Sequence, residues 1–192
     1  MLKIYVNEEP QSIDIPTALA QVSEQRREKT LGYKREGDRR LCLAAYLLLR
    51  QGIREVYGID YAPVFDYAPR GKPSIAGHPE IEFNISHCPM AAACVISDMP
   101  VGIDVESIRP FKSDLGHYVL NDDEYRQVVE SADPDVEFIK LWTMKESLLK
   151  MTGEGISGDL PTILQSDSAG HVFTTKVNAS YVLTVCSAPL LV

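Results

Sequence analysis

Six short stretches of the chain carry the residue pattern of β-strands. The clearest is 101–106, where three aliphatic residues alternate with one glycine and two acids. The other five are 2–6, 82–86, 91–97, 171–177 and 181–187. Turn residues separate 82–86 from 91–97 and 171–177 from 181–187, so we predict that these stretches form two antiparallel pairs.

Longer stretches repeat apolar residues every three or four positions, which is the period of an α-helix. The strongest pattern runs from Arg39 to Tyr57, with Gly37-Asp38 as its cap and Gly58 at its end. A polar, basic helix is predicted at 23–33 and another helix at 121–131. A fourth helix, described below, contains the single tryptophan of the chain.

The order of these elements repeats. A strand, helices and an antiparallel strand pair occur once before 98–100 and once after it. This order predicts an α+β fold with two similar halves, 1–98 and 99–192, related by pseudo-twofold symmetry. Because the twofold relation lies within one chain, we expect a monomer.

The charge of the chain is uneven. Its net charge is -8 and its pI is about 5.0, which argues against non-specific binding to nucleic acid. Nine of the 19 basic residues lie between Arg26 and Arg54, whereas 98–159 holds 14 of the 27 acids and six bases. One half is therefore suited to hold an anion and the other a cation.

The cysteines and the apolar runs indicate a cellular location. The four cysteines form no C-x-x-C pair and have no histidines at zinc spacing, so we expect reduced thiols in a core. The N-terminus becomes acidic too early for a signal peptide, and the longest apolar run, 41–49, is too short for a membrane span. We therefore expect a cytoplasmic protein that does not enter a membrane.

Two acids on the 101–106 strand need an explanation. Asp104 and Glu106 lie on the same face, roughly 6 to 7 Å apart, where their charges repel. A divalent cation is the simplest partner, and oxygen ligands of this kind suit Mg²⁺. The alternative is an exposed edge strand with two solvated acids, and this pair alone does not exclude it.

The helix with the tryptophan adds a third carboxylate. Asp133-Pro134 are start signals and Gly153 is an end signal. Within the helix, Trp142, Glu146 and Lys150 follow at intervals of four and share one face, with Lys145 one residue off that line. An exposed Glu-Lys ion pair at this spacing is common and remains the alternative.

Basic residues near the start of the 39–57 helix are candidate anion ligands. Arg39 and Arg40 are predicted to lie in the first turn, where free backbone N–H groups and two guanidinium groups suit a phosphate. The alternative is surface pairing with acids such as Glu36. Further basic residues that could enlarge an anion site are Arg26, Arg27, Lys29, Lys34 and Arg35.

The stretch Phe83-Asn84-Ile85-Ser86-His87 places a serine beside a histidine. Adjacent strand residues point to opposite faces, so this pair cannot form the nucleophile–base hydrogen bond of a hydrolase. Strand geometry predicts Phe83 and Ile85 in the core, with Asn84 and Ser86 on the opposite face.

Three motifs together resemble one family. They are G-I-D-x-E at 102–106, W-x-x-K-E-S-x-x-K at 142–150, and G-K-P at 71–73 followed by F-N-I-S-H at 83–87. They resemble the 4'-phosphopantetheinyl transferases, in the larger single-chain branch typified by the surfactin-synthetase activator. The resemblance implies an active site between the halves. It also implies transfer of phosphopantetheine from coenzyme A to a serine of an acyl or peptidyl carrier protein, with release of adenosine 3',5'-bisphosphate.

The resemblance also assigns roles to residues. Asp104, Glu106 and Glu146 fall on the Mg²⁺ ligands, and Lys150 falls on a lysine at the pyrophosphate. Coenzyme A would be held by Lys72 near the nucleotide, by Arg40 or Arg39 at the 3'-phosphate, and by Ser86, His87 and Lys145. The general base is either Glu146, which we favour, or a metal-bound water held by Glu106.

Two other functions fit the same residues. One is a Mg²⁺-dependent phosphohydrolase that cleaves a nucleotide diphosphate such as coenzyme A without a carrier. The other is a protein that binds a carrier without catalysis, although a pure binder needs no set of three acids. If a carrier is the partner, the stretch from Arg109 to Leu120, with Phe111 and Leu115, is the predicted docking surface.

Overall fold

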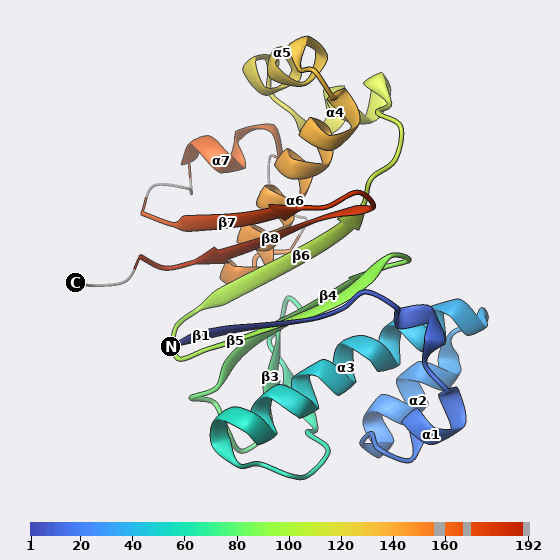
Figure 1. Cartoon of the computed structure of the whole chain (residues 1–192). Helices are drawn as coiled ribbons and strands as arrows, with labels where there is room; N and C mark the ends of the chain where they lie inside the picture. The colour runs from blue at the N-terminus through green and yellow to red at the C-terminus, as the bar shows by residue number, and fades with distance from the viewer. Residues whose placement is uncertain (156–159, 167–169, 190–192) are drawn as a thin grey trace.

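The computed structural model describes residues 1–155, 160–166 and 170–189 (Figure 1). The fold is α+β, as predicted, and consists of two halves that each place helices against a three-stranded antiparallel sheet. The first half contains β1 (Leu2–Asn7), a 3-10 turn η1 (Pro10–Ser12), α1 (Ile15–Leu19), α2 (Glu24–Gly32), α3 (Glu36–Tyr57), β2 (Phe65–Tyr67), β3 (Pro73–Ile75), β4 (Glu82–Cys88) and β5 (Ala91–Ser97). The second half contains β6 (Val101–Ser107), α4 (Ser113–Val119), α5 (Asp122–Glu130), α6 (Pro134–Thr152), η2 (Leu160–Thr162), α7 (Ile163–Ser166), β7 (Val172–Val177) and β8 (Tyr181–Ser187).

The two sheets have the same connectivity, which supports the pseudo-twofold relation. In each three-stranded sheet, the strand that comes first in the chain pairs with the strand that comes last. The last strand occupies the centre of the sheet, and the third strand forms the other edge. The strand orders are therefore β1-β5-β4 and β6-β8-β7. The predicted antiparallel pairs, β4 with β5 and β7 with β8, are both confirmed.

Each half has its own apolar core. In the first, α3 packs against the sheet, and Leu49 and Tyr46 of this helix are fully buried in the apolar cluster. In the second, α6 packs against β6 and β8, and Leu148 of α6 is fully buried in this cluster. A third apolar cluster joins the halves, because Val95 of β5 and Ile103 of β6 belong to the same buried group.

The long helices begin and end at recognisable residues. The side chain of Asp133 accepts a hydrogen bond from the backbone N–H of Val136 at 3.1 Å, as expected of an N-cap. Gly58 and Gly153 end α3 and α6 with φ values of +69° and +76°, which favour glycine. The prediction for the start of α3 was wrong by three residues, because the helix already begins at Glu36.

The structure also contains elements that the sequence pattern missed. The short hairpin of β2 and β3 lies within a stretch predicted as turns, and α4 follows β6 where no helix was predicted. These elements have three to seven residues, so they depend on contacts with the rest of the fold more than on a periodic pattern.

Two further findings concern the cysteines and the helices. All four cysteines are buried and free, as predicted. Within the described part of the chain, none of the helices combines the length and the apolar character that a membrane span requires.

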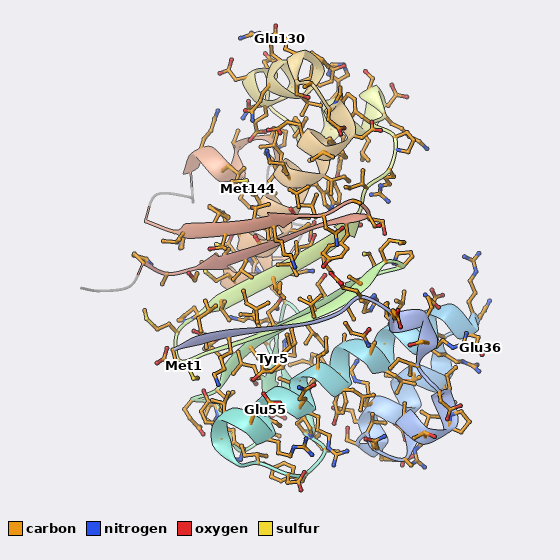
Figure 2. The ribbon with its side chains drawn as sticks, viewed as in Figure 1. Met1, Tyr5, Glu36, Glu55, Glu130 and Met144 are labelled. Carbon is orange, nitrogen blue, oxygen red and sulfur yellow. The ribbon has the colours of Figure 1, made fainter. Side chains whose placement is uncertain are left out.

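Figure 2 shows the labelled Glu36 at the outer end of the first half, where the side chain of this residue is 63% exposed.

Candidate active site

Two adjoining cavities lie where the halves meet. The larger, of about 420 Å³, and the smaller, of about 240 Å³, share Glu146 and Lys150 of α6 and Ile85 of β4 in their walls. The larger cavity also reaches Asp104 and Glu106 of β6. Side chains from both halves therefore face one continuous cleft.

Asp104 is the most buried acid of the cleft, with 3% of its surface exposed. Its Oδ1 atom accepts hydrogen bonds from Nζ of Lys150 at 2.6 Å and from Oγ of Ser86 at 2.9 Å. Its Oδ2 atom is buried and has no hydrogen-bond partner among the described residues. One oxygen of this carboxylate thus remains available to a cation.

A glycine brings β6 close enough to α6 for these contacts. A Cβ atom at Gly102 would lie 2.0 Å from the carbonyl oxygen of Ser147 and 2.6 Å from the backbone nitrogen of Met151. Both atoms belong to the backbone of α6 and cannot move aside independently. Gly102 therefore sets the distance between the strand that carries Asp104 and the helix that carries Glu146 and Lys150.

Glu106 and Glu146 complete a group of three acids around the cleft. Burial raises the pKa of both carboxyl groups, and the nearby charge of Asp104 raises both pKa values further. The Oε1 atom of Glu146 is buried without a hydrogen-bond partner in the described structure. The electrostatics of the site thus indicate a lack of positive charge.

The ammonium group of Lys150 supplies part of the positive charge. As arranged in the structure, no three His, Cys, Asp or Glu side chains of the described residues form a group that could hold a metal ion. Lys150 contacts Asp104 directly, which occupies one oxygen of that carboxylate. The unpaired oxygens of Asp104 and Glu146 nevertheless fit an oxygen-seeking cation such as Mg²⁺.

The first half contributes a basic corner to the larger cavity. His87, at the end of β4, lies there with Arg26 and Lys29 of α2. Arg26 is 5% exposed, and its guanidinium group lies 4.9 Å from the ring centre of Tyr46 and 5.1 Å from that of Phe65. This stacking fixes the direction of a buried positive charge.

His87 itself is held toward its neutral form. Its pKa is lowered, first because neighbouring groups shield the ring from water and next because of the charge of Lys150. His87 lines the larger cavity, so a bound anion could contact it.

Arg39 and Arg40 line neither cavity, so the predicted phosphate contact of this pair is not supported. Because α3 begins at Glu36, the backbone N–H of Arg39 already bonds the carbonyl of Arg35, and no free helix start remains at this position. The guanidinium group of Arg39 donates to the carbonyl of Tyr33 at 2.9 Å, and that of Arg40 pairs with Glu36. The basic residues that reach the cavity are instead Arg26 and Lys29, which the sequence offered only as additions.

Lys145 also lies away from the cleft, so its predicted contact with coenzyme A is not supported. It is 1% exposed, and its Nζ donates to Oε2 of Glu124 at 2.7 Å and to the carbonyl of Leu160 at 2.8 Å. Successive helix residues are about 100° apart, so Lys145 and Glu146 face different neighbours. Lys145 joins α6 to α5 and to the segment at 160–161.

Lys72 and Ser86 lie in the cleft but are engaged by protein groups. Nζ of Lys72 donates to the carbonyl of Met151 at 2.9 Å, at the end of α6, and to Glu82 at 3.3 Å. The hydroxyl of Ser86 donates to Asp104 and accepts from Lys150 and from the backbone N–H of Val105. One donated and two accepted bonds use the full capacity of a hydroxyl. Contacts of these two side chains with coenzyme A therefore stay predictions.

A cleft with three acids on one side and two cationic side chains and a histidine on the other suits a ligand that combines phosphate groups with a metal ion. Comparisons with known proteins agree with such a site. Residues 7–97 match the family model for the N-terminal part of 4'-phosphopantetheinyl transferases. Residues 100–186 match the model of the 4'-phosphopantetheinyl transferase superfamily.

Curated relatives cover most of the chain. A 4'-phosphopantetheinyl transferase of Bacillus subtilis is 31% identical in an alignment that covers 88% of this chain and 84% of the relative. The transferase Sfp of Bacillus subtilis strain 168 is 29% identical over 87% of this chain and 82% of its own length. An L-aminoadipate-semialdehyde dehydrogenase-phosphopantetheinyl transferase of Saccharomyces cerevisiae is 29% identical, over 85% of this chain and 63% of its own. The chain belongs to the 4'-phosphopantetheinyl transferase superfamily and is an enzyme of that class.

Proposed function

We propose that this enzyme transfers the 4'-phosphopantetheine group of coenzyme A to a serine hydroxyl of an acyl or peptidyl carrier protein. The observation that carries the proposal is the convergence of Asp104, Glu146 and Lys150 with a basic corner on one cleft. Membership of the transferase family supports it independently. We also propose a monomeric, cytoplasmic protein that binds neither membranes nor nucleic acid, with its halves divided between residues 98 and 99.

Asp104, Glu106 and Glu146 are the proposed ligands of Mg²⁺. Two of them have a buried oxygen without a partner among the described residues, and burial raises the pKa of Glu106 and Glu146. When bound, Mg²⁺ would neutralise negative charge on the pyrophosphate of coenzyme A. The ammonium group of Lys150, next to Asp104, acts in the same region and stabilises charge on the phosphate oxygens.

The bond changes assign a task to Glu146. The serine oxygen of the carrier forms a bond to the β-phosphorus of coenzyme A, and the bond from that phosphorus to the bridging oxygen breaks. Adenosine 3',5'-bisphosphate leaves with the bridging oxygen, and the serine must lose its proton. We assign the proton to Glu146, since a carboxylate with a raised pKa is a better base near neutral pH. A water held by Glu106 remains the alternative acceptor.

The basic corner is the proposed site for the nucleotide end of coenzyme A. Arg26 presents a buried guanidinium group in a fixed direction, and Lys29 and His87 lie in the same cavity. These three replace Arg39 and Arg40 as the proposed ligands of the 3'-phosphate. Lys72, at the smaller cavity, stays a candidate for contact with the nucleotide.

The carrier would approach beside α4. Tyr118 is 68% exposed on this helix, and Lys112 is exposed at its start. Phe111 packs against Phe138 and Tyr125, with ring centres 5.2 Å and 6.0 Å apart, so its replacement would test folding as much as docking. Tyr118 and Lys112 are therefore better positions for a docking test than Phe111 and Leu115.

The test of the function is the intact mass of an apo carrier protein after incubation with this enzyme, coenzyme A and Mg²⁺. We expect the mass to rise by one phosphopantetheine and the rise to disappear with EDTA. Consumption of coenzyme A with no change in several carriers would identify a phosphohydrolase. No change in either reactant would leave two readings, a protein that binds without catalysis or a carrier partner that was not among those tried.

A further inference from the structure

One edge of the second sheet faces the first half without strand pairing. β6 is the edge strand of its sheet, and successive N–H groups of a strand point alternately to its two sides. The N–H groups of Ile103 and Val105 point to the same side, and both residues are fully buried. A buried N–H group needs an acceptor, and none of the described strands supplies one to these two.

Two side chains of β4 serve as the acceptors. Oδ1 of Asn84 accepts from the N–H of Ile103 at 3.1 Å, and Oγ of Ser86 accepts from the N–H of Val105 at 3.3 Å. Residues two apart on a strand lie on the same face, about 7 Å from each other. The spacing of Asn84 and Ser86 on β4 therefore matches the spacing of the two N–H groups on β6. The two sheets are thus joined by side chains.

Asp104 lies between the two bonded positions. Its backbone is held on one side through Ile103 by Asn84 and on the other through Val105 by Ser86. Ser86 also donates a hydrogen bond to the carboxylate of Asp104, whereas Asn84, among the described residues, bonds to β6 through the backbone N–H of Ile103. Asn84 is 5% exposed and lines the smaller cavity beside Glu146 and Lys150.

We propose that Asn84 is a positioning residue of the transfer reaction. Its amide oxygen holds β6 through the N–H of Ile103 and thereby sets the place of the Asp104 carboxylate relative to Lys150 and Glu146. The proposal rests on the proposed function, because its kinetic consequence arises through the proposed metal ligand Asp104. Asn84 itself need not contact either substrate.

The test compares wild-type protein with Asn84→Ala and Asn84→Asp. In Asn84→Ala the amide of Ile103 should exchange its hydrogen about tenfold faster or more, because its acceptor is gone. Asn84→Asp keeps an oxygen at the same place and should restore the protection. In transfer assays, Asn84→Ala should lower kcat about tenfold and raise the Mg²⁺ concentration for half-maximal rate several-fold, with KM for coenzyme A within about twofold.

The matched control is Tyr181→Phe. The hydroxyl of Tyr181 donates to Glu8 at 2.6 Å, so this bond also joins the two halves, and Tyr181 lines neither cavity. Its loss should lower the melting temperature while kcat and the Mg²⁺ requirement stay at wild-type values. An Asn84→Ala protein that behaves kinetically like Tyr181→Phe would overturn the proposal, as would unchanged exchange at Ile103.

A readout without coenzyme A separates this proposal from the proposed function. The rise in melting temperature that Mg²⁺ produces in the full chain should be smaller in Asn84→Ala than in wild type and Tyr181→Phe. If the wild-type protein transfers nothing to any carrier, the proposed function fails while amide exchange and the Mg²⁺-dependent shift still decide the role of Asn84. Equal Mg²⁺ shifts in all three proteins would contradict that role.

Discussion

The helices α3 and α6 occupy corresponding places in the two halves but differ in what they bury. The buried residues of α3 are aliphatic, aromatic or small apolar side chains, with one cysteine and one glycine. α6 buries Thr143, Lys145 and Ser147 among its apolar residues and presents Glu146 and Lys150 to the cleft. The comparison indicates that α3 contributes mainly stability, whereas α6 gives up part of its apolar contact to hold charged groups in fixed positions.

The largest expected difference concerns two glycines. Gly102→Ala places a methyl group 2.0 Å from a backbone oxygen of α6, so we expect a loss of about 3 kcal/mol or more in unfolding free energy. Gly52→Ala in α3 meets Cδ1 of Ile96 at 2.4 Å and the ring of Tyr5 at 2.7 Å, which are ends of side chains that can shift. Alanine also favours the helix, so the net loss should be about 1 kcal/mol. Urea unfolding measures both, and equal losses would contradict the close contact of β6 and α6.

The buried ion pair of α6 predicts the next effect. Lys145→Met leaves Glu124 buried without its cation, and we expect a loss of about 3 kcal/mol. Adding Glu124→Gln removes the unpaired charge and keeps a residue type suited to the N-terminal cap of α5, so part of the stability should return. A double-mutant cycle by urea unfolding measures the coupling. Additive losses would show that the two side chains do not interact.

These helices also show what the sequence could predict. The apolar period of α3 and the start and end signals of α6 gave both elements, because both patterns are local. The structure does not support the predicted roles of Arg39 and Lys145, because such roles depend on where a helix begins and which neighbour each of its faces meets. Because α3 begins three residues earlier than predicted, the backbone N–H of Arg39 is already bonded within the helix.

For the candidate site, too, the sequence predicts some residues and not others. The resemblance of three motifs to one family brought Asp104, Glu106, Glu146 and Lys150 into one prediction, and the structure places all four at one cavity. Arg26 was named only as one of several bases, because its stacking on Tyr46 and Phe65 joins residues about 20 and 40 positions away. Asn84 was assigned a face but no partner, since its contact with β6 crosses between the halves.

The smallest predicted effect concerns protons in the basic corner. The pKa of His87 is lowered in the free protein, and a phosphate beside the ring would raise it. Between these two pKa values the ring is neutral without coenzyme A and charged with it, so binding should take up a fraction of one proton. Calorimetry in buffers of different ionisation enthalpy measures this uptake. His87→Gln should remove it, and uptake that persists in the variant would place the effect elsewhere.

The central claim is that Glu146 acts directly in transfer, and two substitutions on the same helix test it. We predict that Glu146→Gln lowers kcat/KM for formation of the holo carrier about 100-fold or more, with its melting temperature preserved. Glu137→Gln is the matched control, because Glu137 lies on α6 but pairs with Lys140 outside both cavities. This variant should retain the wild-type rate. Transfer by Glu146→Gln at the rate of Glu137→Gln would contradict the account.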